Sequence, residues 1–123
     1  MELNQITGQI VDAAMKVHTK LGPGLLESAY QACLAYELRQ RGLRVETEVE
    51  LPIQYEGIQL DVGYRLDLLV ESQVIVELKS VEKVIPLYEA QLLSYLKLSG
   101  LKIGLLINFN AVRLKDGITR LAN

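Results

Sequence analysis

Cysteine and histidine are nearly absent from this sequence, whose 123 residues include one of each, Cys33 and His18. A single cysteine cannot form an internal disulfide, so a disulfide framework is excluded and nothing indicates an oxidising compartment. Cys33 lies on the apolar stripe of a predicted helix and is interpreted as a small buried hydrophobe. A lone histidine does not make a zinc site, and it has no evident partners for a serine-hydrolase triad. Zinc, thiol and serine-nucleophile chemistry are therefore disfavoured.

The sequence also lacks long apolar runs and an excess of positive charge. No run is long enough to cross a membrane, and the polar residues near the N-terminus do not fit a signal peptide. The formal net charge of −2 argues against a protein that coats nucleic acid by bulk attraction. It permits an enzyme whose acidic site holds a metal. We expect a cytoplasmic protein with no membrane partner.

Length and an ordinary globular composition predict a single domain over residues 1–123. Changes of hydrophobic period along the chain predict the order helix, helix, about three strands, helix, strand, and a small terminal hairpin. We therefore expect an α/β fold in which helices flank a central mixed β-sheet. The expected ranges are helices at about 4–20, 25–41 and 86–98, strands at 43–53, 60–64, 65–70, 74–79 and 102–109, and the terminal hairpin at 112–114 and 118–121.

The hairpin formed by residues 65–70 and 74–79 carries the most informative side chains. If residues 71–73 form its loop, Asp67 lies directly opposite Glu77, because side chains alternate between the faces of a strand. Two facing carboxylates repel each other unless something neutralises them. A divalent cation is the natural candidate, and magnesium prefers oxygen ligands and binds one or two carboxylates.

Lys79 follows Glu77 by two positions and therefore shares its face. A lysine beside a metal and a water molecule can assist the deprotonation of the water or stabilise charge on a phosphate. These groups are what the hydrolysis of a phosphodiester needs. The alternative is a solvated hairpin face on which Arg65 or Lys79 forms a cross-strand ion pair with the acids, and spacing alone leaves both interpretations open.

Two helices contribute further candidates. Glu27 lies in the first turn of the second helix, where the helix dipole alone favours a carboxylate, or where it could be a third acid of a metal site. Gln91 and Tyr95 are one turn apart on the third helix and point the same way, either as a polar helix edge or as part of the site. Glu46, Glu48 and Glu50 form an acidic strand face across which nucleic acid is not expected.

Several motifs resemble a known family. Residues 24–30, GLLESAY, resemble the motif that names the GxxExxY proteins, which are assigned to the PD-(D/E)xK nuclease superfamily. Asp67 with Glu77-Leu78-Lys79 resembles the split metal motif of that superfamily, although Leu66 replaces the proline. Residues 91–95, QLLSY, resemble its QxxxY motif. The resemblance spans nearly the whole chain and implies a restriction-endonuclease-like core.

The same resemblance implies the role of each residue in a nuclease that depends on Mg²⁺ or Mn²⁺. Asp67, Glu77 and the backbone carbonyl of Leu78 would bind the metal, with Glu27 completing the site, and Lys79 would be the catalytic lysine. Gln91, Tyr95 and Tyr30 would bind or flank the substrate, which would be DNA or RNA. Because the platform is small, a homodimer or a partner protein is expected. The alternatives are a non-catalytic module that binds nucleic acid or protein, and a structural domain with surface ion pairs.

Overall fold

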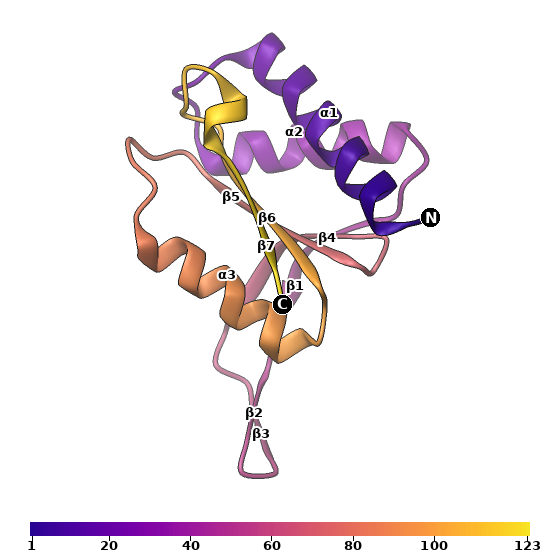
Figure 1. Cartoon of the computed structure of the whole chain (residues 1–123), viewed down its shortest axis with the longest axis vertical. Coiled ribbons are helices and arrows are strands. Elements are labelled where there is room, and N and C mark those ends of the chain that lie inside the picture. Colours follow the sequence, from indigo (N-terminus) through magenta and orange to yellow (C-terminus); the bar gives the residue numbers. More distant parts are fainter.

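The computed structural model describes the whole chain, residues 1–123 (Figure 1). Two helices come first, five strands follow, and the third helix separates these from the last two strands. The elements are α1 (Leu3–Leu21), α2 (Glu27–Gln40), β1 (Val45–Glu50), β2 (Ile53–Tyr55), β3 (Ile58–Leu60), β4 (Arg65–Val70), β5 (Val74–Lys79), α3 (Pro86–Ser99), β6 (Ile103–Asn108), a 3-10 helix η1 (Leu114–Gly117) and β7 (Ile118–Ala122).

Five strands form one mixed sheet in the order β1-β4-β5-β6-β7. Only β5 and β6 are parallel, because the chain between them crosses over through α3. The expected α/β fold with a central mixed sheet flanked by helices is confirmed, and it is consistent with a restriction-endonuclease-like core. The helices lie on opposite sides of the sheet, with α1 and α2 on one side and α3 on the other (Figure 1).

Alternation along β5 divides its side chains between two cores. Val74, Val76 and Leu78 belong to the larger core with residues of α1 and α2, whereas Ile75 packs with α3. Glu77 and Lys79 have the same parity as Ile75 and therefore share the α3 face. The approach of α3 is close at Gly104 of β6, where a Cβ atom would lie 2.9 Å from the Leu92 side chain.

The helices begin and end close to the predicted positions. The first buries a stripe that includes Ile6, Ile10 and Val17. The third begins at Pro86, whose missing N–H costs nothing at the first helical position, and ends at Gly100 in the left-handed conformation. No helix combines the length and the apolar character that crossing a membrane requires.

The strand expected over residues 43–53 ends early. β1 stops at Glu50, before Leu51 and Pro52, and proline cannot donate a hydrogen bond to continue a ladder. The chain then forms a separate two-stranded ribbon, β2–β3, which projects from the sheet (Figure 1). Its turn is the predicted one, with Glu56 and Gly57 both at positive φ, 51° and 76°. The returning strand covers Ile58–Leu60 and does not extend to Tyr64.

The small terminal hairpin predicted over residues 112–114 and 118–121 is wrong. Leu114–Gly117 form the 3-10 helix η1, and Ile118–Ala122 pair with β6 as the antiparallel edge strand of the main sheet. The physical reason is that β6 offers a whole unpaired edge to the last strand, whereas a three-residue partner offers little. Five ladder positions with β6, from Ile103–Ala122 to Ile107–Ile118, replace the expected hairpin.

Candidate functional site

Asp67 and Glu77 meet where the β4–β5 ladder ends. The ladder pairs Val70 with Val74, as predicted, and its last pair is Leu68–Val76. At the next position of the same register, side-chain carboxylates accept the hydrogen bonds in place of backbone carbonyls. The backbone N–H of Asp67 donates to Oε2 of Glu77 at 2.8 Å, and the backbone N–H of Leu78 donates to Oδ2 of Asp67 at 2.8 Å. The two acids are therefore fixed as a pair between diverging strands.

Burial makes the charges on this pair costly. Glu77 is only 8 % exposed, and burial followed by the charge of Asp67 raises its pKa to about 8. Burial also raises the pKa of Asp67, and the charges of Glu48 and Glu27 act in the same direction, while the N–H of Leu78 opposes them. Without a cation, the two carboxylates compete for a proton at neutral pH.

No basic side chain forms an ion pair with either acid. Arg65 pairs instead with Glu50 at 3.9 Å. The Lys79 ammonium lies 4.4 Å from the centre of the Tyr88 ring, a cation–π contact. The alternative of a solvated hairpin face with a cross-strand ion pair to Asp67 or Glu77 is therefore wrong.

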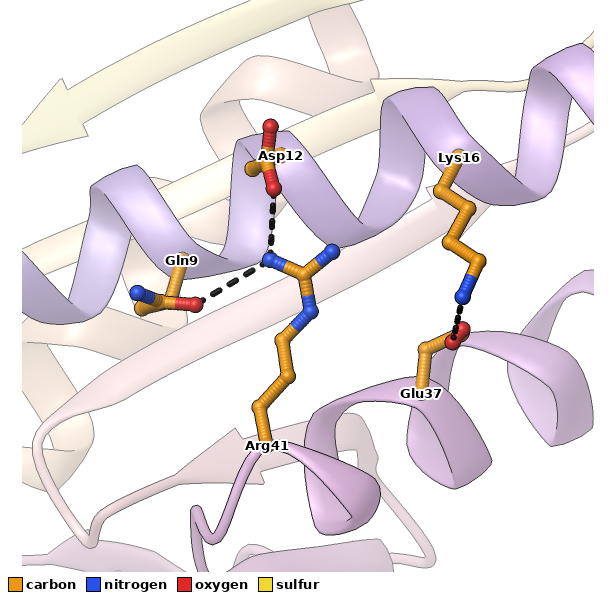
Figure 2. A network of polar contacts seen from close by, with 5 residues as sticks. All are labelled: Gln9, Asp12, Lys16, Glu37 and Arg41. Atoms are coloured by element: carbon orange, nitrogen blue, oxygen red, sulfur yellow. Dashed lines mark hydrogen bonds and ion pairs between the residues drawn. The ribbon is translucent and has the colours of Figure 1, made fainter.

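The other ion pairs hold α1 and α2 together (Figure 2). Arg41, just after α2, donates to Asp12 of α1 at 2.7 Å and to Gln9 at 3.1 Å. Lys16 of α1 pairs with Glu37 of α2 at 3.0 Å. These cations are engaged on the helix pair and do not neutralise Asp67 and Glu77.

Lys79, Gln91 and Tyr95 line one open groove of about 600 Å³ between α3 and the base of the ribbon. These predicted residues come from two elements, β5 and α3, and the fold brings them together. Burial raises the pKa of Tyr95 to about 12, with the charge of Glu77 next in importance, so its hydroxyl stays protonated and able to donate. Tyr64 completes this wall, with its ring centre 5.9 Å from that of Tyr95.

Glu27 lies at the beginning of α2, at the rim of the site. Its side chain is exposed, and its charge contributes to the raised pKa of Asp67. The loop before it is tied to the end of β5, because the Ser80 hydroxyl donates to the backbone carbonyl of Leu25. Ser80 directly follows Lys79, so this hydrogen bond couples the position of α2 to the strand that carries Glu77 and Lys79.

Tyr30 does not face the groove, and the expectation that it binds substrate is corrected. Its side chain is fully buried and stacks on Phe109 with ring centres 4.5 Å apart. Its hydroxyl donates to the carbonyl of Gly22 and accepts from the N–H of Leu25 at 3.1 Å. Gly24 between them has φ +99°, which other residues rarely adopt. Tyr30 and Gly24 therefore shape the loop that positions Glu27.

Four residues at the site were not singled out from the sequence. Glu48 lies between Thr47 and Val49, which pair with Leu68 and Leu66, so the register places it opposite Asp67 although the two are not paired. It has φ 53°, a left-handed conformation that is uncommon outside glycine. The sequence placed Glu48 on an acidic strand face, but it did not predict the register in which β1 pairs with β4. Tyr64, Tyr88 and Ser80 carry no motif, and only the fold brings them to Lys79 and Leu25.

The donor set fits a hard divalent cation. Two carboxylates and the adjacent Leu78 carbonyl are oxygen donors, and magnesium binds one or two carboxylates while keeping places for water and phosphate. No group of three Asp, Glu, His or Cys side chains has the spacing of a metal site. An all-protein cage, such as a structural zinc site, is therefore not what these residues form.

Comparison with known proteins gives one match. The chain matches the family described as the PD-(D/E)XK nuclease superfamily over residues 4–121, which is nearly its whole length. No curated protein and no solved structure matches the chain. The matched range runs from Asn4 in α1 to Leu121 in β7, and therefore includes every residue of the site described above.

Proposed function

The chain belongs to the PD-(D/E)XK nuclease superfamily, and we propose that it is a metal-dependent nuclease that hydrolyses phosphodiester bonds of DNA or RNA. Nucleases of this superfamily generally use divalent metal ions and bind nucleic acid. The observation that carries the proposal is the buried pair Asp67–Glu77, with which no basic side chain of the chain forms an ion pair. The charge of Lys79 lowers the pKa of Glu77, but burial and the charge of Asp67 outweigh it. A buried pair of like charges is costly, and a divalent cation would turn that cost into binding energy.

In this proposal Asp67 and Glu77 would hold Mg²⁺ or Mn²⁺, and the carbonyl of Leu78 would be a further ligand. When bound, the cation would act as a Lewis acid, which makes a water molecule more acidic and withdraws charge from the phosphate. Glu27 would support the same site from the beginning of α2. The hydrogen bonds from the N–H groups of Asp67 and Leu78 keep the two carboxylates in place, so little reorganisation is needed on binding.

Lys79 is the proposed catalytic residue. Its ammonium shares the face of Glu77 and lines the open groove, where it can contact a phosphate oxygen and stabilise developing negative charge. The Lys79 ammonium also lies 4.4 Å from the centre of the Tyr88 ring, which helps to hold it at the groove. Gln91 and the protonated hydroxyl of Tyr95 line the same groove as donors, and we assign them to positioning the substrate.

We further assign the chain to the GxxExxY proteins within the superfamily. The support is that Gly24, Glu27 and Tyr30 act as one local unit. Gly24 provides the left-handed turn, Tyr30 ties its two sides together, and Glu27 begins the helix that follows. Assembly as a homodimer or with a partner protein stays a prediction, which sedimentation of the purified chain would test.

The test is cleavage of labelled DNA and RNA, single-stranded and duplex, with Mg²⁺, with Mn²⁺ and with EDTA. We expect cleavage that requires metal, is lost in Glu77→Gln, and falls about 100-fold or more in Lys79→Met. Lys79→Met should still bind metal, which separates its role from that of the carboxylates. Binding of nucleic acid without cleavage by the folded wild type, with either metal, would instead identify a non-catalytic binding module.

A further inference from the structure

The groove beside Lys79 differs in composition from the chain as a whole. Seven of its ten lining residues are hydrophobic, Lys79 is its one cation, and none is acidic. The whole chain, by contrast, has 15 acidic and 13 basic residues, and the acidic pair Asp67–Glu77 lies on the same face of the sheet. The groove is therefore suited to a ligand that combines a negative charge with flat apolar surface.

Aromatic rings provide that apolar surface. Tyr64, Tyr88 and Tyr95 line the groove, and Lys79 lies against the Tyr88 ring. Tyr64 is 42 % exposed and Tyr88 is partly buried, so both rings are accessible, whereas Tyr95 is nearly covered. Gln91 and Ser94 add polar groups along the α3 side. Bases that are free of a duplex stack on rings of this kind, with little dependence on sequence.

The lining of the groove and the ribbon beside it do not suit a continuous duplex. Binding of duplex depends on several Lys and Arg contacts to phosphates. The ribbon and its flanks, residues 51–64, contain no basic residue and carry Glu56 and Asp61. Arg41 and Lys16 are engaged between α1 and α2, on the opposite side of the sheet from α3. Lys79 is the one cation that lines the groove, so the groove itself can hold one phosphate but cannot follow two backbones. Arg65, Lys83 and Lys97 are exposed but lie outside its lining.

We propose that this groove binds an unpaired nucleotide beside the scissile phosphate, so that the preferred substrate is single-stranded nucleic acid or an unpaired segment. The inference rests on the proposed nuclease function and names its substrate class. A volume of about 600 Å³ lies within the usual range for small-ligand sites, which is enough for a nucleotide. One base stacks on Tyr64 or Tyr88, and Lys79 contacts the phosphate next to it.

Binding measured in EDTA tests the proposal independently of cleavage. The probes are a labelled single strand of about 10 nucleotides and the duplex of the same sequence, compared by fluorescence anisotropy. We expect the single strand to bind more tightly than the duplex. Tyr64→Ala and Tyr88→Ala should weaken its binding about 5- to 100-fold, whereas Tyr64→Phe and Tyr88→Phe, which keep the rings, should bind like the wild type. Tyr36→Ala is the matched control, because Tyr36 is an exposed tyrosine in a separate groove between α1 and α2.

The following results would overturn the proposal. The first is equal or tighter binding of the duplex, the second is unchanged binding in both alanine variants, and the third is no binding of a single strand by the folded wild type. If Tyr64→Ala instead abolishes self-association of the chain, the groove is an interface between copies, which also overturns it. Metal-dependent cleavage of duplex that Tyr64→Ala leaves unchanged would refute this substrate class while the nuclease proposal stands. Binding of the single strand with no cleavage under any metal would refute the nuclease proposal, while the preference of the groove for unpaired nucleotides would stand.

Discussion

The backbone N–H of Asp67 donates to the carboxylate of Glu77 at 2.8 Å, so the two acids are held side by side by the chain itself. The β4–β5 ladder would normally use this N–H, and its last backbone pair lies one step earlier, at Leu68–Val76. Regular backbone pairing between β4 and β5 therefore ends at the point where the two carboxylates face each other. Such an arrangement costs stability in the absence of a cation and favours binding of one.

Glu77→Gln is predicted to stabilise the metal-free protein. Glutamine keeps an oxygen that can accept from the Asp67 N–H, but it does not have to take up a proton on folding at neutral pH, as the Glu77 carboxyl with its raised pKa must. We expect the free energy of unfolding at neutral pH to rise by about 1–3 kcal/mol, since each pKa unit corresponds to about 1.4 kcal/mol. Urea denaturation in EDTA measures it. Glu46→Gln, an exposed change on β1, should alter stability by less than about 0.5 kcal/mol. Equal destabilisation by both variants would contradict the prediction.

The stability of the metal-free chain should fall as the pH rises from about 4.5 to about 8. The pKa of Glu77 is raised from 4.5 to about 8 in the folded chain, so the folded state keeps a proton that the unfolded state has released. Unfolding then becomes easier with rising pH across this window. Urea midpoints in EDTA measured at intervals across it test the sign. Glu77→Gln should flatten the dependence, and a wild-type midpoint that rises through the same window would refute the assignment.

Tyr30→Phe tests the corrected role of Tyr30. The variant removes the hydroxyl that bridges Gly22 and Leu25 while it keeps the ring stacked on Phe109. We expect a loss of about 1–2 kcal/mol in the free energy of unfolding. The KM for nucleic acid should stay unchanged, because the side chain is fully buried. A raised KM with unchanged stability would restore the earlier expectation of substrate contact.

Ser80→Ala should reduce activity with little effect on the fold. The Ser80 hydroxyl joins the end of β5 to the loop before Glu27, so its loss frees that loop relative to the site. Residues that orient a metal site from outside typically change affinity or activity about 10- to 100-fold. The matched control is Ser99→Ala, which removes a similar hydroxyl-to-carbonyl hydrogen bond at the end of α3. Cleavage rates and metal affinity are compared, and an equal loss in both variants would contradict a specific role of Ser80.

The local elements and the acid pair could be predicted because they depend on short-range patterns. Alternation and the position of the loop were enough to place Val70 opposite Val74, and the bounds of this hairpin are confirmed. Pairing between distant segments could not be predicted in this way. The placement of Glu48 opposite Asp67 depends on the β1–β4 register, and β7 found the edge of β6 rather than a local partner.

The same limit applies to the groove. Gln91 and Tyr95 were found because they are one turn apart on a helix. Tyr88 and Tyr64 lie on different elements, and only the packing of α3 against the sheet brings them beside Lys79. Tyr30 was misjudged for a related reason, since its spacing from Glu27 suggests a shared face, while burial against Phe109 directs its hydroxyl to the Gly22–Leu25 loop.

Calorimetric titration of the chain with Mg²⁺ and Mn²⁺ decides whether Asp67 and Glu77 form a metal site. It is carried out with and without a single-stranded oligonucleotide, on the wild type, Asp67→Asn, Glu77→Gln and the control Glu50→Gln, which removes an exposed acid from β1. We predict saturable binding to the wild type and to the control, and its loss in both site variants. Unchanged affinity in the folded site variants, or no binding to the wild type even with the oligonucleotide, would contradict the proposed metal site and the nuclease chemistry built on it.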